Sequence, residues 1–299
     1  MSYKTVLVHV DASPQAPSRI ACAGAIAAAE KDSAGPGHLV GAATTGVSRF
    51  LYRNIPSANP DANLELHLDF LRAQARQALD GFAARARALG VGSFEERVLD
   101  DEAGGGISLM ARYADLVVIS QFDPAQPSPS VMADFPEYVV LHAGRPVLVL
   151  PHAADSGSAD AAQPGWSRNI LIAWNASKEA SRAVSAALPL LKRAGKVSIA
   201  IVDLQHNAEA HGRDPGADIA LYLKRHGVGD TSIVRRETPA RGLKRPADAG
   251  ETLLSLAAEL AADLLVMGAY GHSRFREIIL GGATRSILKS MTLPVLMMH

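Results

Sequence analysis

The chain has 299 residues, of which 48% are hydrophobic and 20% are charged, and its thirty Lys and Arg residues balance thirty Asp and Glu residues. This balance gives no bulk basic field that would indicate DNA or an anionic membrane as a partner. The single cysteine, Cys22, excludes an internal disulfide framework, and no apolar run reaches the roughly 20 residues that cross a bilayer. Because no signal-peptide pattern opens the sequence, we expect a cytoplasmic protein.

Three segments of the first half return, in the same order, in the second half. The matched pairs are Val6–Ser13 with Ile170–Ser177, Ala114–Ile119 with Ala262–Met267, and Arg145–Val149 with Leu293–Met297. The first pair is offset by 164 residues and the other two by 148. This order indicates an internal duplication. We therefore predict one domain over 1–152, a second over 166–299, and a small, polar, flexible linker over 153–165.

Short apolar runs alternate with helical patterns along both halves. In the first half, one long helical pattern over about 62–89 holds most of the 16 residues by which the middle of this half is longer. The second half predicts strands over 169–174, 197–203, 231–235, 263–268 and 294–298, and helices over 177–193, 215–226, 250–262 and 282–290. Uniformly apolar strands separated by helices are typical of an open parallel sheet with helices on both faces.

The most informative segment of the sequence follows the strand that ends at Gly268. Gly268 and Gly271 come directly after this strand, while Gly281 and Gly282 open the next helix. In open α/β sheets, ligands bind outside the carboxyl ends of the strands, where glycines let backbone N–H groups approach a phosphate. The N-terminus of a helix adds unpaired N–H donors. A phosphate here could also take a hydroxyl or a positive charge from Ser273, Arg274 and Thr284.

The spacing Gly-x2-Gly-x9-Gly, formed by Gly268, Gly271 and Gly281, resembles the ATP-binding signature of the universal stress protein family. The resemblance implies that each half is a five-stranded parallel sheet of the adenine-nucleotide α-hydrolase-like, Rossmann-like kind. It also implies that the second half binds ATP or another adenine nucleotide, with or without Mg²⁺, and that the strand end at Val202 lies beside the adenine. The nucleotide-binding residues that it implies are Ala173, Asn175, Val202, Met267, Gly268, Gly271, Ser273, Arg274, Gly281, Gly282, Ala283 and Thr284.

Two positions of the second half depart from the family pattern. Gly282 stands where the family usually has Ser or Thr, and Asn175 stands where the family has Asp at the end of the first strand. Asn can form hydrogen bonds but brings no negative charge for Mg²⁺. We therefore expect nucleotide binding more than metal-assisted hydrolysis.

The first half keeps the acidic residue but loses the loop. Asp11 ends its first strand, whereas the three glycines are replaced by Ser120, Asp123 and Ala133. The position equivalent to Thr284 is Pro136, which has no N–H donor, and Asp123 and Asp134 would repel a triphosphate. We predict that this half does not bind ATP in the family manner and acts as a structural or regulatory partner.

No catalytic motif emerges, since GxSxG, HExxH and GxxxxGK[ST] patterns are all absent. The leading hypothesis is a stress-response protein that binds an adenine nucleotide as a regulatory ligand, with little or slow hydrolysis. The alternatives are a nucleotide-independent scaffold or small-ligand binder, and an ATPase or nucleotidyl transferase. Members of the resembled family commonly pair through their last strands. The segments 146–150 and 294–298 are therefore expected to pair within the chain as a pseudo-dimer, and two chains could form a homodimer.

Overall fold

A computed structural model describes residues 2–29, 31–32, 35–48, 62–128, 130–152, 167–206, 208–239, 248–271 and 282–299. The chain divides into two compact units, Ser2–Val147 and Leu148–His299. The predicted linker over 153–165 lies outside the described residues, and the domain limits at 152 and 166 stay predictions.

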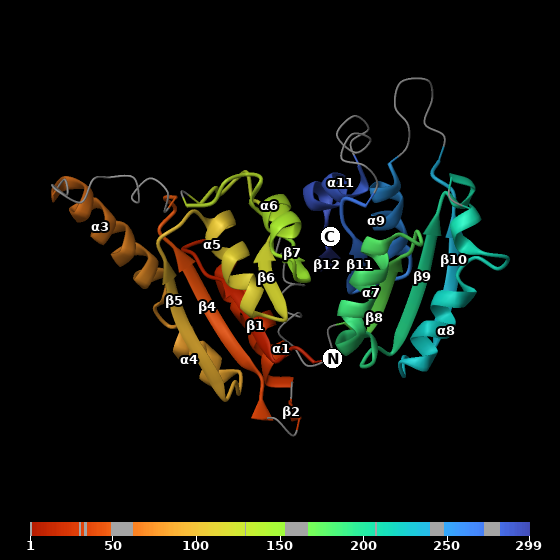
Figure 1. Cartoon of the computed structure of the whole chain (residues 1–299), viewed down its shortest axis with the longest axis horizontal. Coiled ribbons are helices and arrows are strands. Elements are labelled where there is room, and N and C mark those ends of the chain that lie inside the picture. The colour runs from red at the N-terminus through yellow and green to blue at the C-terminus, as the bar shows by residue number, and fades with distance from the viewer. Residues whose placement is uncertain are drawn as a thin grey trace. The chain divides into compact units, whose positions relative to one another are not determined.

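The first unit is built on a parallel sheet with the strand order β6-β1-β4-β5 (Figure 1). The strands are β1 (Thr5–His9), β4 (His38–Thr44), β5 (Ser93–Leu99) and β6 (Leu116–Ser120). Val117 N–H donates to the carbonyl of Pro146 at 3.0 Å, so the residue before β7 (Val147–Leu150) lies alongside β6. A small antiparallel hairpin, β2 (Lys31–Asp32) with β3 (Gly35–Pro36), precedes β4.

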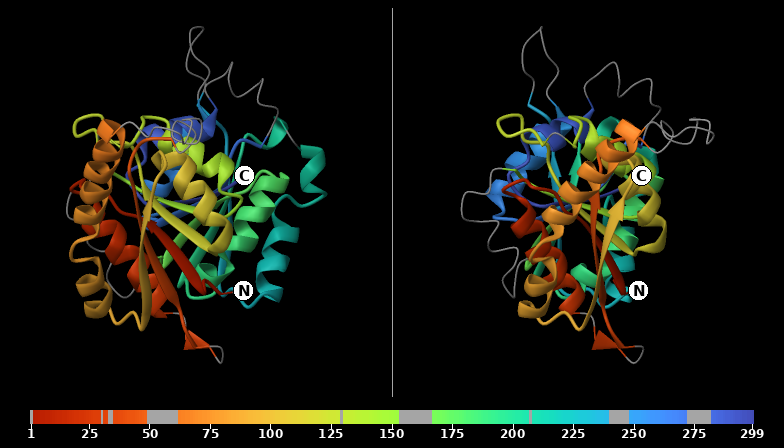
Figure 2. Two further views of the ribbon diagram at one scale, coloured as in Figure 1. Left: turned by 60° about the vertical axis from the view of Figure 1, so that its left-hand side comes forward. Right: turned by 90° about the vertical axis from the view of Figure 1, so that its left-hand side faces the viewer.

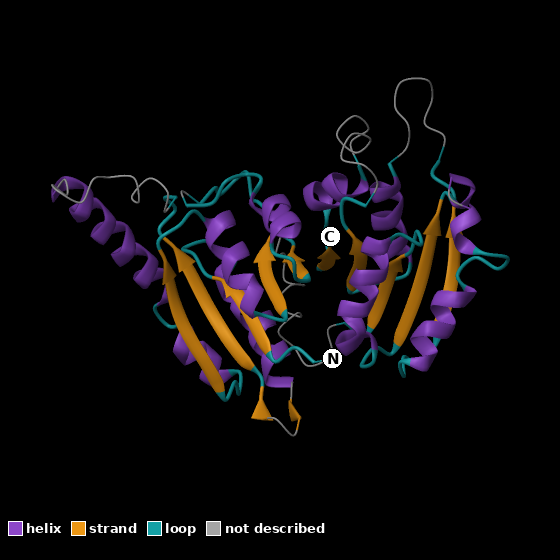
Figure 3. Ribbon diagram, viewed as in Figure 1, coloured by secondary structure: helices purple, strands orange, loops and turns teal. Residues whose placement is uncertain are grey.

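Helices cover this sheet in two groups (Figure 3). The first pairs α1 (Ala16–Ala29) with α4 (Phe82–Ala88), and the second pairs α5 (Ala103–Met110) with α6 (Phe135–His142). A further helix, α3 (Ala62–Leu79), packs against β4 and β5 (Figure 2), and a short 3-10 helix, η1 (Ala111–Tyr113), follows α5. The strands β1, β4 and β6 supply the core because their apolar side chains are removed from water on both faces of the sheet, whereas β5 is only partly buried.

The long helix predicted over 62–89 is wrong in one respect, because it is two helices. The break lies at Asp80 and Gly81, where Gly81 has a φ of +81°. An Asp-Gly pair is a common turn signal, and glycine enters the left-handed region without the steric cost that a Cβ imposes. The turn lets α4 pack against β5 and α1, where Phe82 is fully buried.

The second unit has the strand order β10-β9-β8-β11-β12, with all neighbours parallel. Its strands are β8 (Asn169–Ala173), β9 (Lys196–Val202), β10 (Thr231–Arg236), β11 (Leu264–Gly268) and β12 (Val295–Met298). Its helices are α7 (Lys178–Leu191), α8 (Ala217–Arg225), α9 (Ala249–Glu259) and α11 (Ala283–Ser290), with 3-10 turns η3 (Leu204–His206) and η4 (Ala208–His211). The predicted parallel α/β architecture is confirmed, and each predicted strand and helix of this half is found within a few residues of its expected limits.

In the described part of the chain, no helix is both long and apolar enough to span a bilayer. Cys22 is buried in α1, and burial raises the pKa of its thiol to about 12. It is therefore a packed core residue, as the small, apolar sequence around it suggests.

Candidate functional site

Four of the predicted nucleotide-contacting residues lie where neighbouring strands of the second unit end. Ala173 closes β8 and is in register with Met267 of β11, and Gly268 is the last residue of β11. Val202 closes β9, on the other side of β8. From β8 the chain passes through α7 to β9 on one side, while β11 and β12 extend the sheet on the other. Ligands of open α/β sheets bind at such a reversal of strand order.

The chain turns sharply between β8 and α7. The Asn175 side-chain carbonyl accepts from Ser177 N–H at 3.2 Å, and the Ser177 hydroxyl caps α7 by accepting from Ala180 N–H at 3.1 Å. Ala176, between them, has a φ of +57°. Asn175 is exposed at the end of the sheet from which β8 leads into α7.

The exit of β11 is fixed to two other elements. Ala269 N–H donates to the carbonyl of Met298 at 2.9 Å, and Tyr270 N–H donates to the Thr284 hydroxyl at 3.3 Å. Thr284 is buried in the first turn of α11, so its hydroxyl ties this turn to the segment after β11. A hydroxyl that accepts one hydrogen bond keeps its own proton to donate.

The N-terminus of α11 lacks a side-chain cap. Gly282 occupies the N-cap position and has no side chain, and the N–H groups of Ala283 and Thr284 have no hydrogen-bond partner among the described residues. Unpaired N–H groups at a helix start, together with the positive end of the helix dipole, attract anions. Ser273, Arg274 and Gly281 lie outside the described residues, so their predicted contacts stay predictions.

The packing of the protein itself requires Gly268 and leaves little room for a side chain at Gly271. A Cβ built on Gly268 would lie 2.4 Å from Ala180 N, and a Cβ on Gly271 would lie 2.8 Å from Glu179 Oε2. The start of α7 therefore presses directly on the end of β11. The sequence interpretation assigned these glycines to the approach of a phosphate, and the contact with α7 is a further reason for them.

Glu179 is a residue that the sequence interpretation missed. Its side chain is buried in the first turn of α7, and its Oε2 atom has no hydrogen-bond partner among the described residues. Its one described ion pair is to Lys178, at 3.5 Å from Oε1. Acidic residues in the first helical turn are usually exposed and favoured by the helix dipole, so no sequence signal indicated a buried carboxylate beside Gly271.

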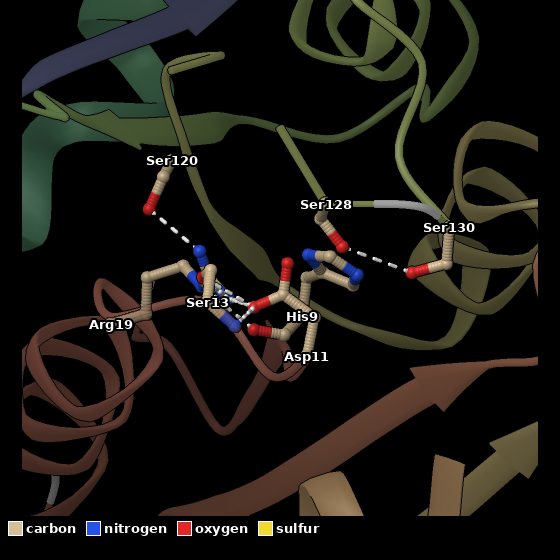
Figure 4. A network of polar contacts seen from close by, with 7 residues as sticks. All are labelled: His9, Asp11, Ser13, Arg19, Ser120, Ser128 and Ser130. Carbon is tan, nitrogen blue, oxygen red and sulfur yellow. Dashed lines mark hydrogen bonds and ion pairs between the residues drawn. The ribbon is translucent and has the colours of Figure 1, made fainter. Parts of the chain in front are cut away.

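The matching strand ends of the first unit are occupied by a buried arginine (Figure 4). Arg19 of α1 donates to the carbonyl of His9 and to the Ser120 hydroxyl, both at 2.9 Å, and forms an ion pair with Asp11. Burial alone would raise the pKa of Asp11, but the Arg19 guanidinium and a hydrogen bond from Ser13 hold it below its usual range. The crevice between β1 and β6 is thus filled by the protein's own cation.

Comparison of the two halves explains Asn175. By the 164-residue offset, Asp11 and Arg19 correspond to Asn175 and Ala183. The second half lacks the buried cation, so it needs no carboxylate to neutralise one, and an amide suffices. The absence of Asp at this position therefore follows from the loss of a buried ion pair.

A second exchange concerns the loop that follows the fourth strand of each half. Gln15 of the first half donates to Asp123 Oδ2 at 3.1 Å. The equivalent positions of the second half are Glu179 and Gly271, which are also adjacent. Each half thus keeps one carboxylate at this contact, on the loop in the first half and on the helix in the second. The second arrangement leaves position 271 without a side chain.

Comparison with known proteins gives one match to a family model. The model of the universal stress protein family matches residues 167–299. A universal stress protein of Synechocystis sp. is 42% identical over 48 residues, a match that spans 16% of this chain and only 17% of that relative.

Two solved structures resemble nearly the whole chain. A universal stress protein from Archaeoglobus fulgidus DSM 4304 superimposes with a TM-score of 0.64 and 16% identity, covering 98% of this chain and 95% of the other. A functionally unknown protein from Pseudomonas aeruginosa PAO1 gives a TM-score of 0.55 and 15% identity, with coverages of 99% and 92%. At such low identity the likeness extends to the fold and no further.

Proposed function

This chain belongs to the universal stress protein family through residues 167–299, and from that premise we propose that its second unit binds ATP or a related adenine nucleotide as a regulatory ligand. The phosphates would lie between the end of β11 and the start of α11, and the base would lie towards Ala173 and Val202. Asn175 would donate to the ribose or to a phosphate oxygen.

One observation carries this proposal: the uncapped N-terminus of α11 is held against the glycine-bearing exit of β11. The hydrogen bond from Tyr270 N–H to the Thr284 hydroxyl joins the two, and Gly282 leaves the first N–H groups of α11 without a side-chain partner. This arrangement offers several aligned donors to an anion at a point where the sheet reverses its strand order.

Regulatory binding with little or slow hydrolysis is favoured over efficient turnover. Asn175 offers no charge to Mg²⁺, and the Glu179 carboxylate is buried beside Gly271. If Mg²⁺ accompanies the nucleotide, its oxygen ligands would come chiefly from the phosphates and from water, as this ion commonly prefers.

A pair of substitutions at Gly282 tests the proposal by isothermal titration of the full chain with ATP, with and without Mg²⁺. Gly282→Ser restores the hydroxyl usual in the family and should tighten binding by about 1 kcal/mol, or roughly fivefold. Gly282→Asp should weaken binding by roughly tenfold or more, because its carboxylate would occupy the anion site. Asp is itself a favourable N-cap, so this variant should remain folded. Equal affinities in the two variants would remove α11 from the site.

A scaffold or small-ligand role without nucleotide is the second candidate, and one contact favours it. Gly268 is needed for the packing of α7, and Gly271 lies against the Glu179 side chain, so the presence of these glycines does not require a phosphate. In addition, the buried Glu179 carboxylate opposes an anion beside it. Absence of any heat with ATP, ADP or AMP in the wild-type chain would favour this role.

We also propose a compartment for the protein, a role for its first unit and a mode of assembly. We place the protein in the cytoplasm, with the first unit as a structural or regulatory partner of the second. Pairing of 146–150 with 294–298 as an intramolecular pseudo-dimer, and association of two chains, belong here as well. Sedimentation velocity over a range of protein concentrations would test the homodimer.

A further inference from the structure

Helix α3 of the first unit carries apolar side chains on two opposite sides. One side packs on the unit, where Leu68, Ala75 and Leu79 are 9%, 4% and 4% exposed. Leu66 and Phe70 lie about half a turn away around the helix axis and are 71% and 57% exposed. Packing on the core needs one apolar side of a helix, so the second side is available for a second contact.

The exposed side of α3 has the spacing of a contact between helices. Leu66, Phe70, Ala73 and Gln77 follow one another at intervals of four, three and four residues, and all are exposed. This spacing is that of a coiled-coil seam. Single exposed apolar residues are common on proteins, but residues at this spacing form a continuous row along one face. We call these four residues the outer stripe.

One edge of the outer stripe is charged in a fixed order. Along the chain this edge carries Glu65, Asp69, Arg72 and Arg76, so two acidic residues precede two basic ones. In an antiparallel pair of identical helices about a two-fold axis, each edge meets the same edge of the other helix in reverse order. Glu65 of one copy then lies opposite Arg76 of the other. Parallel pairing would instead set like charges at the same level.

The same two-fold arrangement matches the sizes of the side chains in the outer stripe. With the axis midway between Phe70 and Ala73, each phenyl ring lies over the small Ala73 of the other copy. Leu66 then lies against the aliphatic part of Gln77. A large side chain opposite a small one lets two helices approach closely, and an aromatic ring contributes a large apolar area to such a contact.

Arg72 fixes α3 to the first unit and so presents the outer stripe in one orientation. Its Nε and Nη2 atoms donate to Oδ1 and Oδ2 of Asp100, which follows β5, at 3.0 and 2.6 Å. Its Nη1 atom donates to Asp69 of α3 at 3.1 Å. A surface that is ordered before it binds loses less conformational entropy on association.

We propose that two copies of this chain associate through α3, antiparallel about a two-fold axis, with the outer stripe as the contact. The charge order favours a second copy over an unrelated partner, because the edge is complementary to itself. This gives a defined face to the association of two chains proposed above, and no residue of the nucleotide site takes part. The contact is short, so the association is weak and reversible, and it closes at two chains.

Sedimentation velocity of the full chain at rising protein concentration tests the contact. The wild-type chain should convert from monomer to dimer. Phe70→Asp should raise the dissociation constant roughly a hundredfold or more, because the burial of two phenyl rings is lost and a charge enters the seam twice. Tyr113→Asp makes the same change of charge at an aromatic residue of the first unit that is 77% exposed, and should leave the dissociation constant unchanged.

A charge exchange at low salt tests the antiparallel order. Glu65→Arg and Arg76→Glu should each weaken self-association roughly three- to tenfold, because like charges then meet at both ends of the contact. An equimolar mixture of the two variants should regain the wild-type affinity, since the exchanged charges are again opposite across the contact. Salt should reduce these differences, because the side chains are exposed.

The possible failures are distinguishable. A wild-type chain that stays monomeric at every concentration overturns both this contact and the association of two chains. A dimer that tolerates Phe70→Asp as well as Tyr113→Asp overturns the contact alone. A mixture of the charge variants that associates no better than its components overturns the antiparallel order. Circular dichroism of each variant separates loss of the contact from loss of fold.

Discussion

His9 lies fully buried at the end of β1, and neither ring nitrogen has a hydrogen-bond partner among the described residues. Burial lowers the pKa of His9 to about 4, although Asp11 opposes the shift. The folded unit thus holds a neutral imidazole that the unfolded chain protonates near pH 6.5. As the pH falls from about 6.5 to about 4, His9 becomes protonated in the unfolded state but stays neutral in the folded state. The free energy of unfolding should drop by roughly 3 kcal/mol across this window.

His9→Phe should remove this pH dependence. Urea unfolding followed by circular dichroism at pH 4.5, 5.5 and 7 would measure it, with exposed His142→Asn as the control. Asp11 does not interfere. Its pKa is lowered, so its contribution is lost only below the ordinary carboxylate range. The explanation fails if the wild-type and His9→Phe chains lose stability equally between pH 7 and pH 4.5.

Glu179 places a buried negative charge beside the loop that is proposed to hold phosphates. Glu179→Gln removes this charge with little change of shape and reproduces the Gln15 of the first half. ATP binding should tighten by about 1 kcal/mol, roughly fivefold, and the gain should persist at high salt because the carboxylate is buried.

Glu251→Gln, an exposed position in the first turn of α9, makes the same change of net charge and serves as the control. Titration calorimetry at low and high salt compares the two. Equal affinities in both variants would mean that Glu179 does not act on the ligand.

The contact between α7 and β11 is the element-scale feature on which the site depends. Gly268→Ala would bring a Cβ to 2.4 Å from Ala180 N, so α7 must move. Overpacking of this kind costs about 1–3 kcal/mol. Gly195→Ala is the matched control, because its Cβ would meet only Arg168 O, at an ordinary 3.5 Å.

Urea unfolding of the two variants measures the difference. The fluorescence of Trp174, which follows β8, reports on the second unit. If Gly268→Ala proves as stable as Gly195→Ala, the close approach of α7 is not a constraint on this position.

The sequence predicts helices and strands well where the spacing of apolar residues follows one period. It predicts them poorly where a single residue ends an element. Apolar runs located the strands, because a parallel sheet buried on both faces leaves no polar alternation to confuse the period. The helix over 62–89 was misjudged because the apolar spacing continues past Gly81, whose φ of +81° turns the chain.

Site residues divide in the same way. The positions of Ala173, Val202, Met267 and Gly268 at neighbouring strand ends were predictable, since parallel topology brings strand ends to one edge; their contact with a nucleotide stays a prediction. The buried positions of Arg19 and Glu179 were not, because each depends on how closely a helix start approaches a strand end.

At the scale of the whole molecule, the internal duplication predicted from the sequence relates two units of similar fold. These units differ by substitutions at pairs of residues that contact each other. The first unit has Asp11 with Arg19, and the second has Asn175 with Ala183. A buried ion pair that loses one partner leaves an uncompensated charge, which typically costs about 3–5 kcal/mol, whereas replacing both partners is often nearly neutral. The two residues of each pair should therefore have changed together, and intermediates with only one change should be unstable.

Substitutions in the first unit can test whether these two positions must change together. Asp11→Asn alone should destabilise it by about 3–5 kcal/mol, because Arg19 stays buried without its carboxylate. Adding Arg19→Met fills the same space with an apolar chain and should recover most of the loss. A double-mutant cycle of urea unfolding, with hydrogen exchange over 2–29 as the local readout, measures the coupling between the two positions. If the double variant is no more stable than Asp11→Asn, the ion pair is not the unit that changed, and Asn175 needs another explanation.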